Sequence, residues 1–195
     1  SVQLYNEIED SKKKFLTFSK ASILYKKLGY KQEAIKYLLL AYDGFDILKM
    51  DAEKATVSGN IGDIQKELGH LEIAEKYYQE HLYLRLKAKD SLKISFAYNN
   101  LANLFLKLKE YDSAIYHYNK ALELQKILGN KKNIGKTLSN LGIVYYLQNN
   151  NDLAKNMYNK ALSFKKETKD TLSIVKTINE LALIAIEENK FKEVK

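Results

Sequence analysis

The sequence contains no cysteine, and this absence excludes disulfide bonds, thiolate chemistry and cysteine-ligated zinc. It also contains no proline and only eight glycines in 195 residues. Proline breaks helix interiors and glycine weakens them, so their scarcity favours helices throughout, joined by short connections. The missing cysteine leaves the compartment open: a cytoplasmic location is favoured, and a periplasmic one is the alternative if the chain is a sensor region.

Arginine and long apolar runs are also scarce. The formal net charge of +8 comes almost wholly from lysine, because Arg85 is the sole arginine. Nucleic-acid surfaces usually use arginine for bidentate contacts, whereas lysine at helical spacing typically covers a solvated face, so we expect no nucleic-acid partner. The longest tight apolar cluster, Tyr37 to Tyr42, is far shorter than the roughly 18 residues that cross a bilayer, so we expect no membrane span.

The chain repeats itself every forty residues without an insertion or deletion. Small residues recur in register at Ala34, Ala74, Ala114 and Ala154, and large ones at Leu38, Tyr78, Tyr118 and Tyr158. Each unit carries two apolar stripes at helical spacing, such as 98–108 and 111–122 in the third unit. We therefore predict two helices per unit. Small residues let the helices approach closely, and the neighbouring aromatic fills the gap.

Short signals at the ends of the stripes predict turns and helix starts. The connection inside each unit begins at Gly29, Gly69, Lys109, Asn149 and Asn189, and glycine and asparagine tolerate the left-handed conformation that ends a helix. Helix starts with N-cap chemistry are predicted at Asp10–Ser11, Asp90–Ser91 and Asp170–Thr171. Two residues depart from the pattern. Gly44 predicts a local weakness inside a second helix, and His81 replaces a small residue, which predicts a looser or shifted contact.

The registered pattern resembles the tetratricopeptide repeat. The third unit carries the family's large and small positions at Tyr98, Leu101, Ala102, Phe105, Ala114, Tyr118 and Ala121. The next unit carries them at Leu141, Gly142, Tyr145, Ala154, Tyr158 and Ala161. The resemblance implies an all-α fold, a right-handed α-α superhelix of about ten antiparallel helices. The period of forty departs from the usual 34, and the final proline of the family pattern is missing.

Forty-residue variants of this kind are similar to repeats in spindle-orientation adaptors, kinesin light chains, bacterial peptide-pheromone receptors and sensors of bacterial two-component proteins. We predict one array over 1–195 that is cut at both ends. Its parts are the end of a preceding repeat at 1–14, full repeats at 15–54, 55–94, 95–134 and 135–174, and a partial repeat at 175–195. Neither end carries a full polar cap, so we expect a longer natural protein and a tendency to associate end to end.

The resemblance also implies a binding surface, because the first helices of such arrays line a concave groove. The residue before the leucine–glycine pair faces inward, and it is Lys20, Asn60, Asn100, Asn140 or Glu180. A primary amide both donates and accepts, so the three asparagines could grip the backbone of an extended peptide as a ladder. Further inward residues, which would read side chains, are Asp63, Lys66, Phe96, Asn99, Asn103, Lys107, Lys136, Ser139, Ile143 and Tyr146. In the alternative interpretation, the asparagines are solvated or bond a neighbouring helix.

The sequence gives little support for chaperone-tail binding, a metal site or catalysis. The family's clamp for acidic carboxy-terminal peptides fits only in part at Gly59, Asp63, Asn100, Lys136 and Asn140, which disfavours chaperone-tail binding. His70, His81 and His117 show no metal-ligand spacing, so we expect no metal site, no cofactor and no catalysis within this chain. We predict a scaffold that binds a protein or peptide. The alternatives are the sensory region of a bacterial signalling protein, such as a histidine kinase or a peptide-responsive regulator, and a homo-oligomerisation module.

Overall fold

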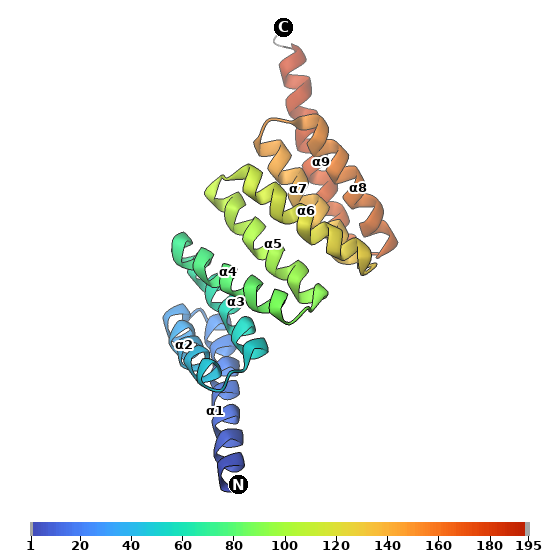
Figure 1. Ribbon diagram of the computed structural model, residues 1–195. Helices are drawn as coiled ribbons and strands as arrows, with labels where there is room; N and C mark the ends of the chain where they lie inside the picture. Colours follow the sequence, from blue (N-terminus) through green and yellow to red (C-terminus); the bar gives the residue numbers. More distant parts are fainter. Residues whose placement is uncertain (1, 194–195) are drawn as a thin grey trace. The chain divides into compact units, whose positions relative to one another are not determined.

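The computed structural model describes residues 2–193, and it describes side chains for residues 7–189. Over these residues the chain is all-α, which confirms the predicted fold class, and nine helices come close to the ten expected. Their bounds are α1 (Val2–Lys27), α2 (Lys31–Ile47), α3 (Asp51–Leu68), α4 (Leu71–Lys87), α5 (Ser91–Leu108), α6 (Tyr111–Ile127), α7 (Lys131–Leu147), α8 (Asn151–Glu167) and α9 (Thr171–Glu193). Figure 1 shows these helices in sequence order.

The chain forms two compact units, and the division falls inside α5, between Leu104 and Phe105. In the first unit α1 packs against α2, α2 against α3, and α3 against α4 (Figure 1). Its core lies where α2 meets α3, and the buried residues there are Ala34, Ile35, Leu38, Ala41, Phe45, Val57, Ile61 and Ile64. The predicted repeat boundaries remain a prediction.

In the second unit α6 packs against α7, α7 against α8, and α8 against α9. A core of Ala154 and Tyr158 from α8 and Ile184 from α9 is surrounded by partly buried Ile143, Tyr145, Tyr146 and Leu181. The alanines at the repeat positions have no exposed surface at all. This burial agrees with the predicted role of small residues in bringing two helices together.

Glycine and tyrosine pair across two of the helix hairpins, α3–α4 and α7–α8. A Cβ atom built on Gly62 would lie 2.7 Å from the Tyr78 ring, and one on Gly142 would lie 2.7 Å from the Tyr158 ring. Such contacts are too close for any residue but glycine. The tyrosine ring therefore fills the space that the small residue leaves on the facing helix.

Both departures from the repeat pattern are compensated across a helix hairpin. His81 is only 8 % exposed, and its ring occupies the place where a Cβ atom on Gly59 would lie. A larger residue at one position is thus offset by a smaller one across the hairpin. Gly44 is likewise no simple weakness, because the Phe15 ring occupies the place where its Cβ would lie.

The turns confirm most of the predicted signals. Left-handed backbone, with positive φ, occurs at Gly29, Lys49, Gly69, Lys89, Lys109, Gly129, Asn149 and Lys169. The carboxylate of Asp90 accepts a bond from the backbone N–H of Lys93 at 3.1 Å, and that of Asp170 accepts one from Ser173 at 3.2 Å, as helix caps.

Both outermost helices are longer than the sequence predicts. No helix begins at Asp10–Ser11, because α1 runs unbroken from Val2 to Lys27. No turn begins at Asn189, because α9 continues to Glu193. Neither place contains a proline or a glycine, so no helix-breaking residue supports the local cap and turn signals.

Candidate functional site

The three asparagines of the predicted ladder lie at one register position of successive first helices: Asn60 on α3, Asn100 on α5 and Asn140 on α7. Each is half-buried, and each precedes two fully buried residues. Their helices therefore present the amides at the edge of the packed face rather than in the core or in open solvent. Asn60 and Asn100 belong to the first unit, and Asn140 belongs to the second.

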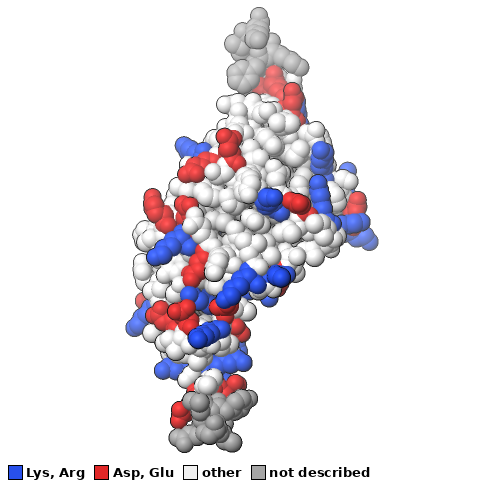
Figure 2. Space-filling model, viewed as in Figure 1, with Lys and Arg blue, Asp and Glu red and all other residues white. Residues whose placement is uncertain are grey.

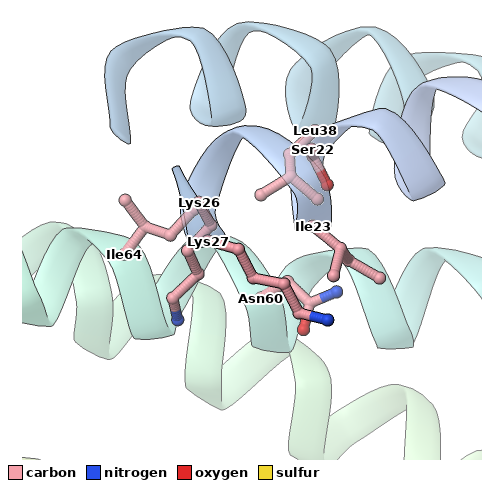
Figure 3. A pocket seen from close by; sticks show the side chains of 7 residues that line it. All are labelled: Ser22, Ile23, Lys26, Lys27, Leu38, Asn60 and Ile64. Carbon is pink, nitrogen blue, oxygen red and sulfur yellow. The ribbon is translucent and has the colours of Figure 1, made fainter. Parts of the chain in front are cut away.

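Asn60 borders a pocket of about 460 Å³ in the first unit (Figure 3). The pocket is lined by Ser22, Ile23, Lys26 and Lys27 of α1, Leu38 of α2, and Asn60 and Ile64 of α3. Leu38 and Ile64 are almost fully buried at its base, whereas Ile23 is 47 % exposed. In Figure 3 the side-chain nitrogen atoms gather along one rim, opposite Leu38 and Ser22. The pocket thus combines an apolar floor with a polar edge.

The other predicted residues of the first unit already contact their own chain. Asp63 accepts a hydrogen bond of 2.5 Å from the Tyr78 hydroxyl, and burial together with this carboxylate raises the pKa of Tyr78. The Lys66 ammonium lies 5.4 Å from the centre of the Tyr78 ring. Asn99 donates to the backbone oxygen of Ser95 at 2.9 Å. This bond lies within α5 itself, so for Asn99 it is neither the solvation nor the bond to a neighbouring helix that the alternative interpretation expected.

Phe96 and Asn103 complete the predicted set in the first unit. Phe96 is 41 % exposed on α5, and Asn103 is half-buried about two turns further along. Neither lines the pocket beside Asn60. The structure therefore brings one predicted residue of this unit, Asn60, to a pocket.

In the second unit the structure brings four predicted residues together. Lys136, Ser139, Asn140 and Ile143 of α7 line a pocket of about 290 Å³. Its other walls are Tyr158 and Lys165 of α8 and Ser173, Lys176, Thr177 and Glu180 of α9. Two predicted residues lie elsewhere: the Tyr146 hydroxyl donates to Glu187 at 2.7 Å, and Lys107 is exposed near the end of α5.

Asn140 also shares a side-chain hydrogen bond with Tyr118 of α6. Burial raises the pKa of the Tyr118 phenol, and the bond to Asn140 acts in the opposite direction. A primary amide has two donor hydrogens and an acceptor oxygen, so one bond to a tyrosine leaves further capacity. Asn140 therefore has both a structural contact and a place in the wall of the pocket.

Sequence reasoning missed a series of buried polar residues on the second helices. The forty-residue step places Phe45, Arg85, Gln125 and Lys165 at one position, and all four are at least nine-tenths buried. Arg85 donates to Thr56 at 2.7 Å, Gln125 accepts from Thr137 at 2.9 Å, and Lys165 donates to Ser139 and Thr177. The repeat register itself could have revealed them, because polar residues there stand where Phe45 forms core.

Each of the three histidines lies within hydrogen-bond distance of another residue of this chain. His70 Nδ1 lies 2.8 Å from Gln65 Oε1, and His117 Nδ1 lies 2.8 Å from the backbone oxygen of Ser113. Burial and the nearby Arg85 guanidinium lower the pKa of His81 to about 4. Within the part of the chain that the structure describes, no three histidine or acidic side chains cluster as metal ligands would.

A polar network also crosses three helices of the first unit. The Tyr42 hydroxyl donates to the Glu80 carboxylate at 2.8 Å, and Lys54 pairs with Glu80 at 3.0 Å and Asp46 at 2.7 Å. Burial, followed by the bond to Glu80, raises the pKa of Tyr42 to about 12. These contacts tie α2, α3 and α4 together and leave little capacity for a ligand.

Charge on the visible surface is mixed. Figure 2 shows lysine and acidic side chains interspersed within each unit on the face drawn. Among helices of the described residues, none is both long and apolar enough to pass through a membrane.

An all-helical chain built from helix hairpins at a fixed sequence period belongs to the class of helical-repeat scaffolds. Two family models, both described as tetratricopeptide repeat, match residues 55–87 and 93–167, which together make up more than half of the sequence. The chain belongs to the tetratricopeptide repeat family. Folds of this type generally serve as scaffolds rather than catalysts. No curated protein sequence matches the chain.

Solved structures with this fold include three informative neighbours. Aspartyl phosphate phosphatase F from Bacillus subtilis is 17% identical with a TM-score of 0.84, over 98% of this chain and 50% of its own. BtubC from P. vanneervenii is 23% identical with a TM-score of 0.75, over 80% of this chain and 64% of its own. A Rap protein complexed with competence and sporulation factor is 17% identical with a TM-score of 0.76, over 91% of this chain and 52% of its own. The chain thus spans between half and two thirds of these neighbours.

Proposed function

We propose that this chain is a scaffold that binds an extended segment of a protein or peptide partner through its first helices. The observation that carries the proposal is the position of Asn60 and Asn140. Each stands at the same point of the repeat, and each borders a pocket in its own unit. A solved Rap protein that holds competence and sporulation factor supports binding as a use of this fold.

The amides would bind backbone, and the pockets would select side chains. An asparagine amide can donate to a peptide carbonyl and accept from a peptide N–H, so it holds an extended chain whatever its sequence. The pocket beside Asn60 has room and an apolar floor for one aliphatic or aromatic side chain. Burying such a side chain contributes about 1.5–3 kcal/mol, which is enough to discriminate between partners.

A preformed helical surface keeps the cost of binding low. Association loses translational, rotational and side-chain freedom, and a rigid scaffold adds no loop ordering to that cost. Asn60, Asn100 and Asn140 are half-buried, so their side chains are already restricted before a partner arrives. Each unit needs only to hold its own stretch of the partner.

The test begins with peptides selected from a random display library against the whole chain. Asn60→Ala, Asn100→Ala and Asn140→Ala should each weaken the selected peptide at least fivefold in calorimetric titration, because each removes about 1 kcal/mol of hydrogen bonding. Asn159→Ala, the same change at an exposed position on the second helix α8, should leave affinity unchanged. Circular dichroism checks that each variant folds. Equal affinity across all four folded variants would remove the ladder from the proposal.

A second candidate function is the regulatory region of a signalling protein. The similarity to aspartyl phosphate phosphatase F, which covers 98% of this chain, favours it. In this account a ligand on the repeats changes the behaviour of a neighbouring domain or a bound partner. Comparing the full-length protein with and without the selected peptide, in an assay of its partner's phosphorylation, tests this candidate.

A further inference from the structure

The pocket of the second unit contains a buried cation in an unusual setting. Lys165 is only 6 % exposed, yet its ammonium donates to two neutral hydroxyls: Ser139 at 2.5 Å and Thr177 at 2.6 Å. Among the side chains that the structure describes, no carboxylate forms an ion pair with Lys165. Buried charges are normally paired, because desolvation is costly, so this ammonium lacks the partner that would compensate it.

The groups around Lys165 add to its positive field. Burial lowers the pKa of its ammonium, Asp170 at longer range raises it, and Lys136 and Lys176 lower it further. Lys136 and Lys176 both line the same pocket and are exposed at its mouth. Three lysines of α7, α8 and α9 therefore line one pocket, together with Ser139, Ser173 and Thr177.

A second group in this pocket lacks a partner. The Tyr158 hydroxyl is buried and makes no hydrogen bond to any residue that the structure describes, although Tyr158 lines the cavity. In the first unit Tyr78, at the equivalent position, donates to Asp63. The forty-residue step replaces that aspartate by Ile143, which cannot accept a hydrogen bond. Tyr158 thus offers a donor that the protein itself does not use.

One acidic group faces the same cavity. Glu180 of α9 lines the pocket, and its charge contributes to raising the pKa of Tyr158, after burial. Along α9 it lies one turn beyond Lys176 and Thr177, so the pocket has a cationic end and an anionic end. The charge pattern sets the direction in which an elongated polar ligand would enter.

We propose that this pocket binds an oxyanion at its cationic end. The oxyanion is the carboxylate or phosphate group of an acidic or phosphorylated side chain on the bound partner. Lys165 supplies the central charge, and Lys136 and Lys176 close over the group. The assignment of the oxyanion to a side chain of the bound partner rests on the proposed function. Binding of an oxyanion as such depends only on the pocket.

The test uses small ions, so it does not depend on a peptide. Chain labelled with ¹⁵N is titrated with sodium acetate and, separately, with sodium phosphate, at an ionic strength held constant with sodium chloride. The amide signals of Ser139, Asn140 and Thr177 should shift and saturate. Saturation by acetate alone identifies a carboxylate site, and saturation by phosphate identifies a site that also takes phosphate groups.

Three variants separate a built site from general attraction to a basic protein. Lys165→Met removes the central charge and should weaken binding at least tenfold, while Lys166→Met, the neighbouring exposed lysine on the same helix, should leave it unchanged. Glu180→Gln should strengthen binding several-fold, because it removes an acidic charge that lines the pocket. Equal responses of the two lysine variants, or no saturable shift with either ion, would overturn the proposal while leaving the peptide titrations unaffected.

Discussion

At the scale of single residues, the contact between His81 and Gly59 shows how this repeat tolerates exceptions. The Arg85 Nε–H donates to His81 Nε2 at 3.3 Å, so the imidazole acts as an acceptor on that side. Its Nδ1 atom is buried against Gly59 and has no hydrogen-bond partner among the residues that the structure describes. The ring is therefore held neutral, in a place that has room for it only because residue 59 lacks a side chain.

This setting predicts a pH-dependent stability. The pKa of His81 falls from its ordinary 6.5 to about 4 in the folded chain, so the unfolded chain binds the proton first as the pH drops. The stability is complete above pH 6.5 and is lost as the pH falls toward 4. Between pH 7 and pH 5 the free energy of unfolding should decrease by about 2 kcal/mol. Urea denaturation across this range measures it.

A matched pair of variants identifies the group. His81→Gln should flatten the stability between pH 7 and pH 5, whereas His70→Gln, at an exposed turn, should retain the slope. A wild-type unfolding free energy that stays level over the range would contradict a neutral, buried His81.

At the scale of elements, the turns are more regular than the sequence suggests. A residue with positive φ ends each helix from α1 to α8, and four of these eight residues are lysine: Lys49, Lys89, Lys109 and Lys169. A side chain in the left-handed region costs energy that glycine avoids. The helix hairpins impose this geometry even where the residue does not favour it.

Replacing one such lysine should therefore stabilise the chain. Lys109→Gly, at φ 63°, should raise the free energy of unfolding by about 0.5–1 kcal/mol, because the strain relieved exceeds the added freedom of the unfolded chain. Gly129→Ala, at nearly the same φ of 64°, is the reverse control and should lower it by a similar amount. Guanidinium denaturation compares them. A destabilised Lys109→Gly variant would show that the lysine side chain itself holds the turn.

The helix hairpins were predictable because several signals coincide in every unit. The register of Ala74 with Tyr78, and of Ala154 with Tyr158, fixed the spacing of the two helices, and the absence of proline kept them whole. The ends of the chain were less predictable. Asp10–Ser11 has good cap chemistry, but a cap forms only where the preceding residues leave the helix, and α1 continues through them.

The candidate site was predictable in part. Repeat position alone selected Lys136, Ser139, Asn140 and Ile143, which line one pocket. Lys165 was not predicted as a site residue, because a lysine on a helix normally lies in solvent. Only tertiary packing shows that this one is buried. Asp63 and Asn99 were assigned to a ligand, yet each also bonds its own chain, since a periodic pattern cannot show where a side chain finds its partner.

At the scale of the whole molecule, two compact units each combine a ladder-position amide with a pocket. The pocket beside Asn60 has an apolar floor, and the pocket beside Asn140 has a cationic end. Under the two proposals, the pocket of the first unit would accept an apolar side chain of a partner, and the pocket of the second unit an acidic one. Recognition would then divide between backbone bonds that are independent of sequence and two pockets that are not.

The most direct measurement of this account is the affinity of a selected peptide and of analogues in which one backbone nitrogen at a time is methylated. Methylation removes a donor hydrogen and leaves the side chains unchanged. The account predicts at least tenfold weaker binding at the peptide units that the asparagines contact, and no further loss when the same analogue meets the corresponding asparagine-to-alanine variant. Undiminished affinity for every methylated analogue would contradict it, because backbone recognition would then play no part.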